Sequence, residues 1–354
     1  MPSVEELVPR EALAAWMPKA GLAAAHVDVE PLGDGHSNLT FRVIASTGER
    51  WVLRRPPAGP LLPTAHDVVR EYRVLSLLAD AEGPVRAPHV VALCEDAAVI
   101  GAPFYLMEEV DGLVIRRELP QEIAGDAAAQ HGLGLDLLES LVEIHRVDWE
   151  PFVDAGIGRP GGYLARQLDR WVGQREGVQQ AVAAAGGQAR ELPDYDAVRD
   201  WLRENRPEES APALVHGDFK LDNTIVDVAS HPLQPRVAAV VDWEMATVGD
   251  PRADLGYLLS FWPEPGETLP LGELVATAPG FPRRVELVDR WANATSRDPG
   301  DPAWFVTLAI WKLAILLEAS YHRWLAGMAD DPFFATLDDG VPALLRRARE
   351  TCGA

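Results

Sequence analysis

The stretch ALVHGDFKLDNTIVDVASHPLQPRVAAVVDWEMATVGD, residues 213–250, alternates short apolar runs with clusters of polar side chains. The first run ends in a loop with four polar residues: His216, Asp218, Lys220 and Asn223. The later run VAAVV ends at the triplet DWE of residues 242–244. Short apolar runs bounded by turn residues predict strands. The stretch therefore predicts a hairpin-like scaffold that presents carboxylates and an amide at one edge.

The polar residues of this stretch suit phosphoryl transfer. Asp218 and Asn223 can face the same space, because they are five residues apart on one loop, and Asp242 ends a strand that would pair beside them. Carboxylate and amide oxygens are ligands that Mg²⁺ prefers, and a further carboxylate can orient a hydroxyl or accept its proton. Lys220 adds a cation to this set. The alternative is that the first motif is a plain turn and the second a strand end with solvated acids. Either motif alone permits this alternative, but the two motifs together disfavour it.

Composition limits the class of protein. The 354 residues suit two domains or lobes, and a hydrophobic content of 47% is ordinary for a globular chain. The formal net charge of −22 argues against a nucleic-acid partner, because phosphate contacts need clustered Lys and Arg, and against an anionic membrane surface. The charge is compatible with a cationic substrate.

Other features bear on location. Cys94 and Cys352 lie far apart and indicate neither a disulfide framework nor a zinc site. The N-terminus has no basic region followed by an apolar core, so no secretory signal is expected. The most apolar long segment, 304–317, contains Lys312 and precedes Glu318, which predicts a segment too short and too interrupted to span a bilayer. We expect a cytoplasmic enzyme.

The first 108 residues predict a small lobe of sheet and helix. Short runs with alternating polarity predict strands near 27–32, 39–45 and 50–55, and two further strands are expected near 89–94 and 103–110. A lead-in helix is expected over 4–20. A second helix, over 66–80, would pack on the sheet through one stripe: Val68, Tyr72, Leu75 and Ala79.

The rest of the chain is predicted to be mainly helical, apart from strands around 214–242. Helices are expected near 126–147, 161–185, 194–205, 251–262, 281–294, 301–325 and 340–351. We therefore predict an α+β fold of two lobes, 1–108 and 109–354, with a cleft between them where ligands tend to bind.

The motifs HGDFKLDN and VVDWE resemble the catalytic loop and metal-binding triplet of kinase-like small-molecule phosphotransferases, including aminoglycoside phosphotransferases and choline kinases. The stretches VLRRPP, REYRVL and FYLMEEVDG are most similar to bacterial phosphotransferases that resemble the kinase-like domain fused to some acyl-CoA dehydrogenases. The resemblance covers roughly residues 25–265. It implies a bilobal protein-kinase-like fold, with a small antiparallel-sheet lobe that binds nucleotide and a larger helical lobe for catalysis and substrate. It also implies ATP and Mg²⁺ as cofactors, although the residues do not separate ATP from GTP.

In the loop, the resemblance implies that Asp218 is the catalytic base that orients the substrate hydroxyl. It implies that Asn223 and Asp242 hold Mg²⁺. Lys220 lies where many kinases place a lysine close to the transferred phosphoryl group, whose charge it could offset.

Two residues outside the loop are expected to support it. The family uses an Asp at the position of Asp254 to brace the catalytic loop, and a helix-capping or helix-dipole role is the alternative. His145 lies on a helix that the family packs under the loop, and we expect a structural histidine there.

In the small lobe, the turn LGDGHSNLTF can cradle phosphates with its backbone N–H groups. Gly33 and Gly35 match the first two glycines of a kinase loop, Asn38 replaces the third, and Ser37 precedes Asn38. A purely structural hairpin turn is the alternative.

The strand WVLRR is expected to supply the cation that clamps the nucleotide phosphates. Strand alternation points Arg54 and Arg55 to opposite faces, and we assign Arg54 to the cleft. Glu71 is its expected partner from the helix, with a solvated glutamate as the alternative.

The connection between the lobes, PFYLMEEVDG, is where the family bonds the adenine edge through backbone groups. Met107, Glu108 and Val110 are the expected positions.

The acceptor is predicted to be a hydroxyl of a small molecule. Only eleven residues lie between Asp242 and Asp254, and Gly217 stands where protein kinases regulated by loop phosphorylation have Arg. Neither a long activation segment nor a peptide-docking platform is therefore expected, which disfavours a protein kinase. The branch resemblance suggests a hydroxy acid or its coenzyme A thioester.

Two other functions remain open. An aminoglycoside or other antibiotic would need clustered acids, and the C-terminal helices carry acids and aromatic residues alike: Glu318, Asp330, Asp331, Asp338, Asp339, Trp304, Trp311, Tyr321 and Trp324. A non-catalytic pseudokinase that binds nucleotide is disfavoured by the complete set of Asp218, Asn223 and Asp242.

Overall fold

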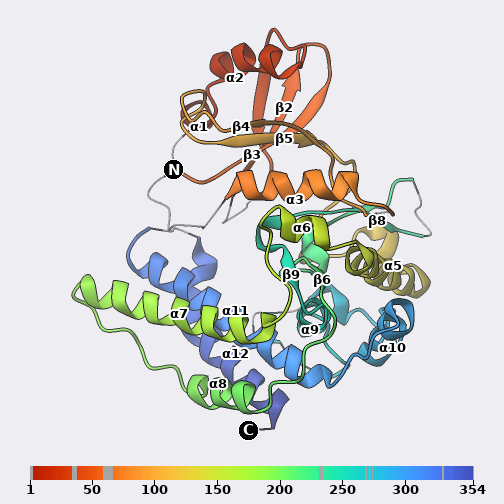
Figure 1. Ribbon diagram of the computed structural model, residues 1–354, viewed down its shortest axis with the longest axis vertical. Helices are drawn as coiled ribbons and strands as arrows, with labels where there is room; N and C mark the ends of the chain where they lie inside the picture. Colours follow the sequence, from red (N-terminus) through yellow and green to blue (C-terminus); the bar gives the residue numbers. More distant parts are fainter. Residues whose placement is uncertain are drawn as a thin grey trace.

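The computed structural model describes residues 3–33, 38–58, 67–83, 85–230, 234–267, 269–270, 272, 274–328 and 331–353. It shows a small lobe of sheet and helix above a larger helical lobe (Figure 1). Gly35 and Ser37 of the predicted phosphate loop, and Asp330, lie outside the described residues.

The small lobe contains a five-stranded antiparallel sheet in the order β1-β2-β3-β5-β4. The strands agree with the predicted runs: β1 (Val27–Pro31), β2 (Leu39–Ala45), β3 (Arg50–Arg55), β4 (Val90–Cys94) and β5 (Phe104–Glu108). The predicted lead-in helix is interrupted at Pro9, the N-cap residue of a new helix, because proline cannot continue the hydrogen-bond ladder. The result is α1 (Val4–Leu7), α2 (Arg10–Trp16) and the 3₁₀ turn Met17–Ala20.

The two faces of the sheet pack on different helices. On one face, Leu53 lies in a core shared with α1 and α2. On the other, Val52 packs with α3 (Val68–Asp80) in the core that continues into the large lobe. The predicted stripe on α3 was partly wrong, because Ala79 is exposed and Tyr72 only half-buried. The buried face of α3 is instead Val68, Glu71, Val74, Leu75 and Leu78.

The large lobe contains the seven predicted helices: α5 (Ala127–Arg146), α7 (Tyr163–Ala184), α8 (Tyr195–Glu204), α9 (Arg252–Ser260), α10 (Arg284–Thr295), α11 (Pro302–Leu325) and α12 (Leu337–Cys352). The short helices α4 (Gln121–Ala124) and α6 (Glu150–Asp154) were not predicted. α11 has the length and composition of a helix that could cross a membrane, so the expectation that this segment is too short was wrong. It packs against α9 and α12, and 67% of its most apolar stretch is buried inside the protein.

The stretch 213–250 forms two separate two-stranded ribbons (Figure 1). β7 (Thr224–Asp227) pairs with β8 (Arg236–Val240), as expected for the strand that ends near Asp242. β6 (Ala213–Val215) pairs with β9 (Thr247–Gly249), a strand that was not predicted. The predicted single hairpin is thus replaced by two ribbons, whose loops bring residues 216–223 and 242–244 together.

Candidate functional site

The loop after β6 is held by a carboxylate from α9. Asp254 accepts hydrogen bonds from the backbone N–H groups of His216 (2.6 Å) and Gly217 (2.8 Å). Gly217 has φ +85°, and a Cβ there would lie 2.7 Å from the Met245 carbonyl oxygen, so this turn requires glycine. Of the two predicted roles of Asp254, bracing of the loop is the one for which the structure shows the contacts.

His145 holds Asp254 in turn. Its Nδ1 accepts a hydrogen bond from the Trp291 indole (2.9 Å), so the proton is on Nε2, which lies 3.4 Å from a carboxylate oxygen of Asp254. His145 is buried. The expectation of a structural histidine beneath the loop is confirmed.

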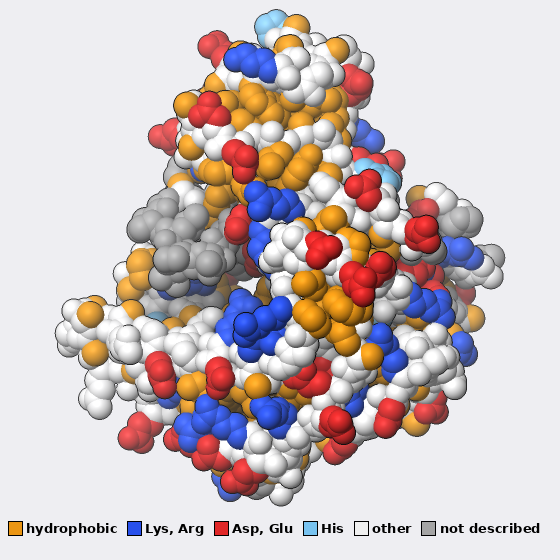
Figure 2. Space-filling model, in the orientation of Figure 1, with side chains coloured by type: hydrophobic (Ala, Val, Ile, Leu, Met, Phe, Trp, Pro, Cys, Tyr) orange, Lys and Arg blue, Asp and Glu red, His pale blue; other side chains and the backbone are white. Residues whose placement is uncertain are grey.

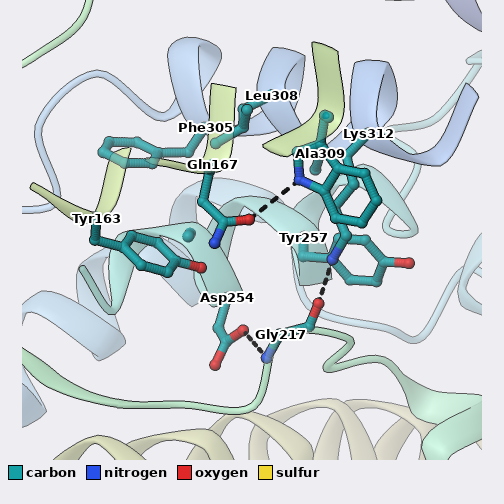
Figure 3. A pocket seen from close by; sticks show the side chains of 11 residues that line it. Tyr163, Gln167, Gly217, Asp254, Tyr257, Phe305, Leu308, Ala309 and Lys312 are labelled. Carbon is teal, nitrogen blue, oxygen red and sulfur yellow. Dashed lines mark hydrogen bonds between the residues drawn. The ribbon is translucent and has the colours of Figure 1, made fainter. Parts of the chain in front are cut away.

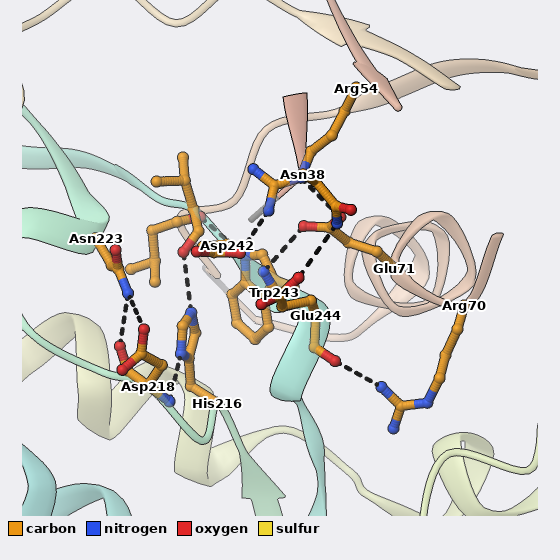
Figure 4. Close-up of polar contacts among 12 residues, drawn as sticks. Asn38, Arg54, Arg70, Glu71, His216, Asp218, Asn223, Asp242, Trp243 and Glu244 are labelled. Atoms are coloured by element: carbon orange, nitrogen blue, oxygen red, sulfur yellow. Dashed lines mark hydrogen bonds and ion pairs between the residues drawn. The ribbon is translucent and has the colours of Figure 1, made fainter. Parts of the chain in front are cut away.

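The loop and the Asp242 strand are joined by hydrogen bonds (Figure 4). The Asn223 amide donates to the backbone oxygen and the carboxylate of Asp218, at 2.8 Å each. The Val241 N–H donates to the Asn223 carbonyl at 2.9 Å, which places Asn223 next to Asp242. The buried His216 ring accepts from the Asp218 N–H (3.2 Å) and reaches the Val241 carbonyl (3.1 Å). Asp218 and Asn223 of the first motif and Asp242 of the second therefore lie in one site.

Asn223 and Asp242 fit a magnesium ion in the company of phosphate oxygens. The side-chain nitrogen of Asn223 is bonded to Asp218, which leaves its oxygen for a cation. Asp242 has a left-handed backbone (φ +69°, ψ 60°), a sparsely populated conformation for a non-glycine residue that tends to mark functional sites. Within the described parts of the chain no three His, Cys, Asp or Glu side chains gather to hold a metal by themselves. Two protein oxygens completed by phosphate and water are a donor set typical of Mg²⁺.

Asp218 lies among positive charges. Burial raises the pKa of its carboxyl, but Lys220, Lys312 and a hydrogen bond with Tyr257 outweigh burial and bring the pKa below its usual value. The Lys220 ammonium lies 3.8 Å from Asp218 and 3.5 Å from Asp222. Asp218 is therefore an ionised acceptor, able to bind a hydroxyl proton.

The small lobe contributes a buried cation. Arg54 donates from Nε to Glu71 (2.8 Å) and from Nη2 to Asp242 (2.5 Å), so the predicted partnership with Glu71 is present. Burial lowers the pKa of Arg54, but Glu71 and Asp242 raise it by more, which keeps the guanidinium charged. Arg55 points to the other face, as expected, and bonds the carbonyls of Leu7 and Ile100.

Glu71 is 1% exposed, so the solvated alternative is wrong. Burial raises the pKa of its carboxyl, against the opposing effect of Arg54. Glu71 also accepts from the Trp243 N–H at 3.2 Å, which links α3 to the acidic triplet. Asn38 is buried and donates to Glu244 at 3.2 Å. Its side chain thus supports the ion-pair network, instead of leaving an open glycine-like position.

The remaining predicted contacts are backbone positions. Gly33, at the start of the predicted phosphate loop, has φ +80°, a conformation that favours glycine. Met107 is buried at the end of β5, and the Glu108 N–H donates to the His89 carbonyl at 2.9 Å. Because that N–H is already bonded, a purine would have to use other backbone groups of this segment, which include those of Val110.

Sequence reasoning missed two residues beside Asp218. Tyr257 on α9 is one of the groups that lower the pKa of the Asp218 carboxyl. Lys312 on α11 donates to the Gly217 carbonyl (Figure 3). The signal for Lys312 was a lysine inside the most apolar segment of the chain, which had served only as an argument against a membrane helix.

The chain is similar to known proteins in sequence and in fold. The model of the phosphotransferase enzyme family matches residues 28–287. Mouse acyl-CoA dehydrogenase family member 11 is 35% identical over 302 residues, which are 83% of this chain and 36% of that protein, so the chain spans about a third of this relative's length. A putative aminoglycoside phosphotransferase from Ralstonia eutropha has a TM-score of 0.75 at 29% identity, with 97% of this chain and 98% of that chain covered. An aminoglycoside phosphotransferase in complex with AMP-PNP and hygromycin B shares the fold, with a TM-score of 0.60 at 14% identity and 99% of both chains covered. The chain belongs to the phosphotransferase enzyme family.

Proposed function

We propose that this protein transfers the γ-phosphoryl group of Mg²⁺-bound ATP to a hydroxyl of a small molecule. The observation that carries the proposal is the joining of Asp218, Asn223 and Asp242 by the Asn223 amide and the Val241–Asn223 backbone bond. A base and two cation ligands in one place are the parts that phosphoryl transfer requires.

Each residue has a separate task in this proposal. Asp218 accepts the hydrogen bond of the acceptor hydroxyl and takes its proton as the oxygen attacks phosphorus. Lys220, beside Asp218, offsets negative charge on the transferred group. Arg54 binds nucleotide phosphates and is oriented by Glu71. Asn223 and Asp242 would hold the magnesium ion, which neutralises phosphate charge.

Two acids of the C-terminal helices, Glu318 and Asp338, are poor candidates for an aminoglycoside site. Glu318 is 3% exposed and paired with Arg190 at 2.7 Å, and Asp338 accepts from Arg190 and Tyr321 at 2.9 and 2.8 Å. Several ammonium groups would need free carboxylates, so these pairs argue against an acidic pocket built on Glu318 and Asp338.

Two of the aromatic residues of these helices, Trp304 and Trp311, are core residues. Trp304 is buried and donates to the Leu202 carbonyl, and Trp311 is buried and stacks on Tyr195 with ring centroids 5.5 Å apart. An aromatic-lined acceptor pocket built from Trp304 and Trp311 is therefore disfavoured as well.

The charges near Asp218 favour an anionic acceptor. On the face shown in Figure 2, Lys and Arg side chains gather where the two lobes meet, although the chain carries a net charge of −22. The cations also lie near one another: Lys220 and the exposed Arg170 both lower the pKa of Lys312. Similarity to an acyl-CoA dehydrogenase family member points the same way, so a hydroxy acid or hydroxyacyl thioester is the acceptor class that we favour.

A screen for Mg²⁺-dependent ADP release tests the proposal. Purified protein is incubated with ATP and with hydroxy acids, hydroxyacyl thioesters, aminoglycosides and other antibiotics, and wild type is compared with Asp218→Asn. We expect turnover with an anionic hydroxyl compound, and its loss in Asp218→Asn while ATP still binds. Wild-type turnover by Asp218→Asn would refute the role of the base. Tight ATP binding without transfer to any compound would favour the pseudokinase.

A further inference from the structure

A buried lysine from the longest helix reaches the residue that precedes Asp218. Lys312 on α11 is 7% exposed, and its ammonium donates a hydrogen bond to the Gly217 carbonyl. It lies 4.5 Å from the centroid of the Tyr257 ring and 5.4 Å from that of Trp171. In the part of the chain that the structure describes, no carboxylate forms an ion pair with Lys312.

Burial of the Lys312 ammonium lowers the stability of the protein. Moving an ammonium group out of water is expensive unless a paired charge and hydrogen bonds replace the water. Lys312 has one carbonyl and two ring faces, which compensate an ammonium only in part. A methionine of similar length would fill the same space without that cost. The position therefore points to a function of the charge and its hydrogen bond.

The Gly217 peptide groups are held from both directions (Figure 3). Asp254 accepts the Gly217 N–H at 2.8 Å, and Lys312 donates to the Gly217 carbonyl. That carbonyl belongs to the peptide bond with Asp218, so its orientation fixes the backbone from which the Asp218 side chain extends. A glycine with φ +85° has no side chain of its own to limit rotation, which makes external contacts decisive here.

The same lysine acts on Asp218 through space. Its charge is one of the causes that lower the pKa of the Asp218 carboxyl, and Tyr257, whose ring lies under the ammonium, is another. We propose that Lys312 is a positioning residue of the transfer reaction, which holds the Gly217–Asp218 peptide so that the Asp218 carboxylate points at the acceptor hydroxyl. This inference rests on the proposed function and adds a requirement to it.

The proposal predicts a pH dependence. The pKa of Lys312 is lowered to about 8, mainly by burial and also by Arg170 and Lys220, while Asp218 and Asp254 oppose the shift. The titratable groups that face Lys312 come from the loop (Asp218, Lys220), α9 (Asp254, Tyr257) and α7 (Arg170). The charge of Lys312 is present below its pKa and is lost above it. Wild-type kcat should therefore fall as the pH rises through about 8.

Lys312→Met and Lys312→Arg form the test, with the acceptor found by the ADP-release screen. Lys312→Met removes the charge and the donor at similar length, and we expect kcat to fall about 10- to 100-fold because a displaced base misaligns the reacting atoms. KM for ATP should stay within about twofold, since nucleotide contacts are untouched. Lys312→Arg keeps a cation and donors, so it should recover most of kcat and extend activity above the wild-type alkaline limit, because arginine stays protonated.

The outcomes distinguish a failure of the Lys312 proposal from a failure of the proposed phosphoryl transfer. Unchanged kcat in Lys312→Met, with turnover still abolished in Asp218→Asn, would overturn the role of Lys312 alone. Turnover retained in Asp218→Asn would overturn the proposed function itself. If urea unfolding shows that Lys312→Met does not fold, the pH profile of kcat provides the test. The same loss of kcat at alkaline pH in wild type and in Lys312→Arg would overturn the proposal.

Discussion

Asp254→Asn changes one atom of the side chain that holds the loop and tests whether the charged acceptor is essential. The carboxylate meets three donors, the N–H groups of His216 (2.6 Å) and Gly217 (2.8 Å) and the Nε2–H of His145 (3.4 Å). Asparagine offers one acceptor oxygen and an NH₂ group. Both backbone N–H groups need an acceptor in this buried site, so at least one of them would face a donor.

The magnitude follows from the number of bonds that are lost. A hydrogen bond to a charged group contributes about 1.5–3 kcal/mol, and an unsatisfied buried donor adds a desolvation cost, so we expect a loss of about 2–4 kcal/mol in the free energy of unfolding. kcat should fall with it, because the Gly217 N–H lies one residue before the base. Urea unfolding and steady-state kinetics measure the two effects.

Glu286→Gln is the matched control, because it too removes a carboxylate that faces a histidine. Glu286 lies 3.1 Å from His131, and these side chains are 32% and 42% exposed. Water replaces such a contact, so we expect a change of about 0–1 kcal/mol. A loss below about 1 kcal/mol in Asp254→Asn, equal to the control, with unchanged kcat, would refute the bracing role.

Two further substitutions test other contacts. Gly217→Ala places a Cβ 2.7 Å from the Met245 carbonyl oxygen at φ +85°, so we expect a loss of about 2 kcal/mol or more in unfolding free energy and a lower kcat; wild-type values for both would show that the turn tolerates a side chain. Arg190→Met leaves the buried Glu318 with His322 as its remaining partner and should cost about 3–5 kcal/mol in urea unfolding. Its kcat on an anionic acceptor should be unchanged, and a gain of activity on aminoglycosides would contradict the assignment of these acids to structure.

The sequence predicted most of the regular structure, because its periodicities are local. β1 and β2 follow a pattern of two residues, β3 and β5 are short runs buried on both faces, and the long helices follow a pattern of 3.6 residues. β9 is only three residues long, Thr247–Gly249, and gives no such pattern. The stripe on α3 was wrong at Tyr72 and Ala79, because a period of apolar residues does not reveal that the buried face includes Glu71, a carboxylate whose burial is compensated by Arg54.

The loop of residues 216–223 also combines features that the local sequence predicts with contacts that it does not. Its own residues could be assigned from the motif, since Asp218 and Asn223 are five positions apart. Its supports come from far along the chain: Asp254 is 37 residues from Gly217, and Lys312 is 95 residues from it. Both bind backbone groups, and every residue has those groups, so no pattern in the loop indicates which side chain will meet them. The sequence does show a lysine inside an apolar helix. Only the fold, which brings α11 against the loop, shows that this lysine contacts Gly217.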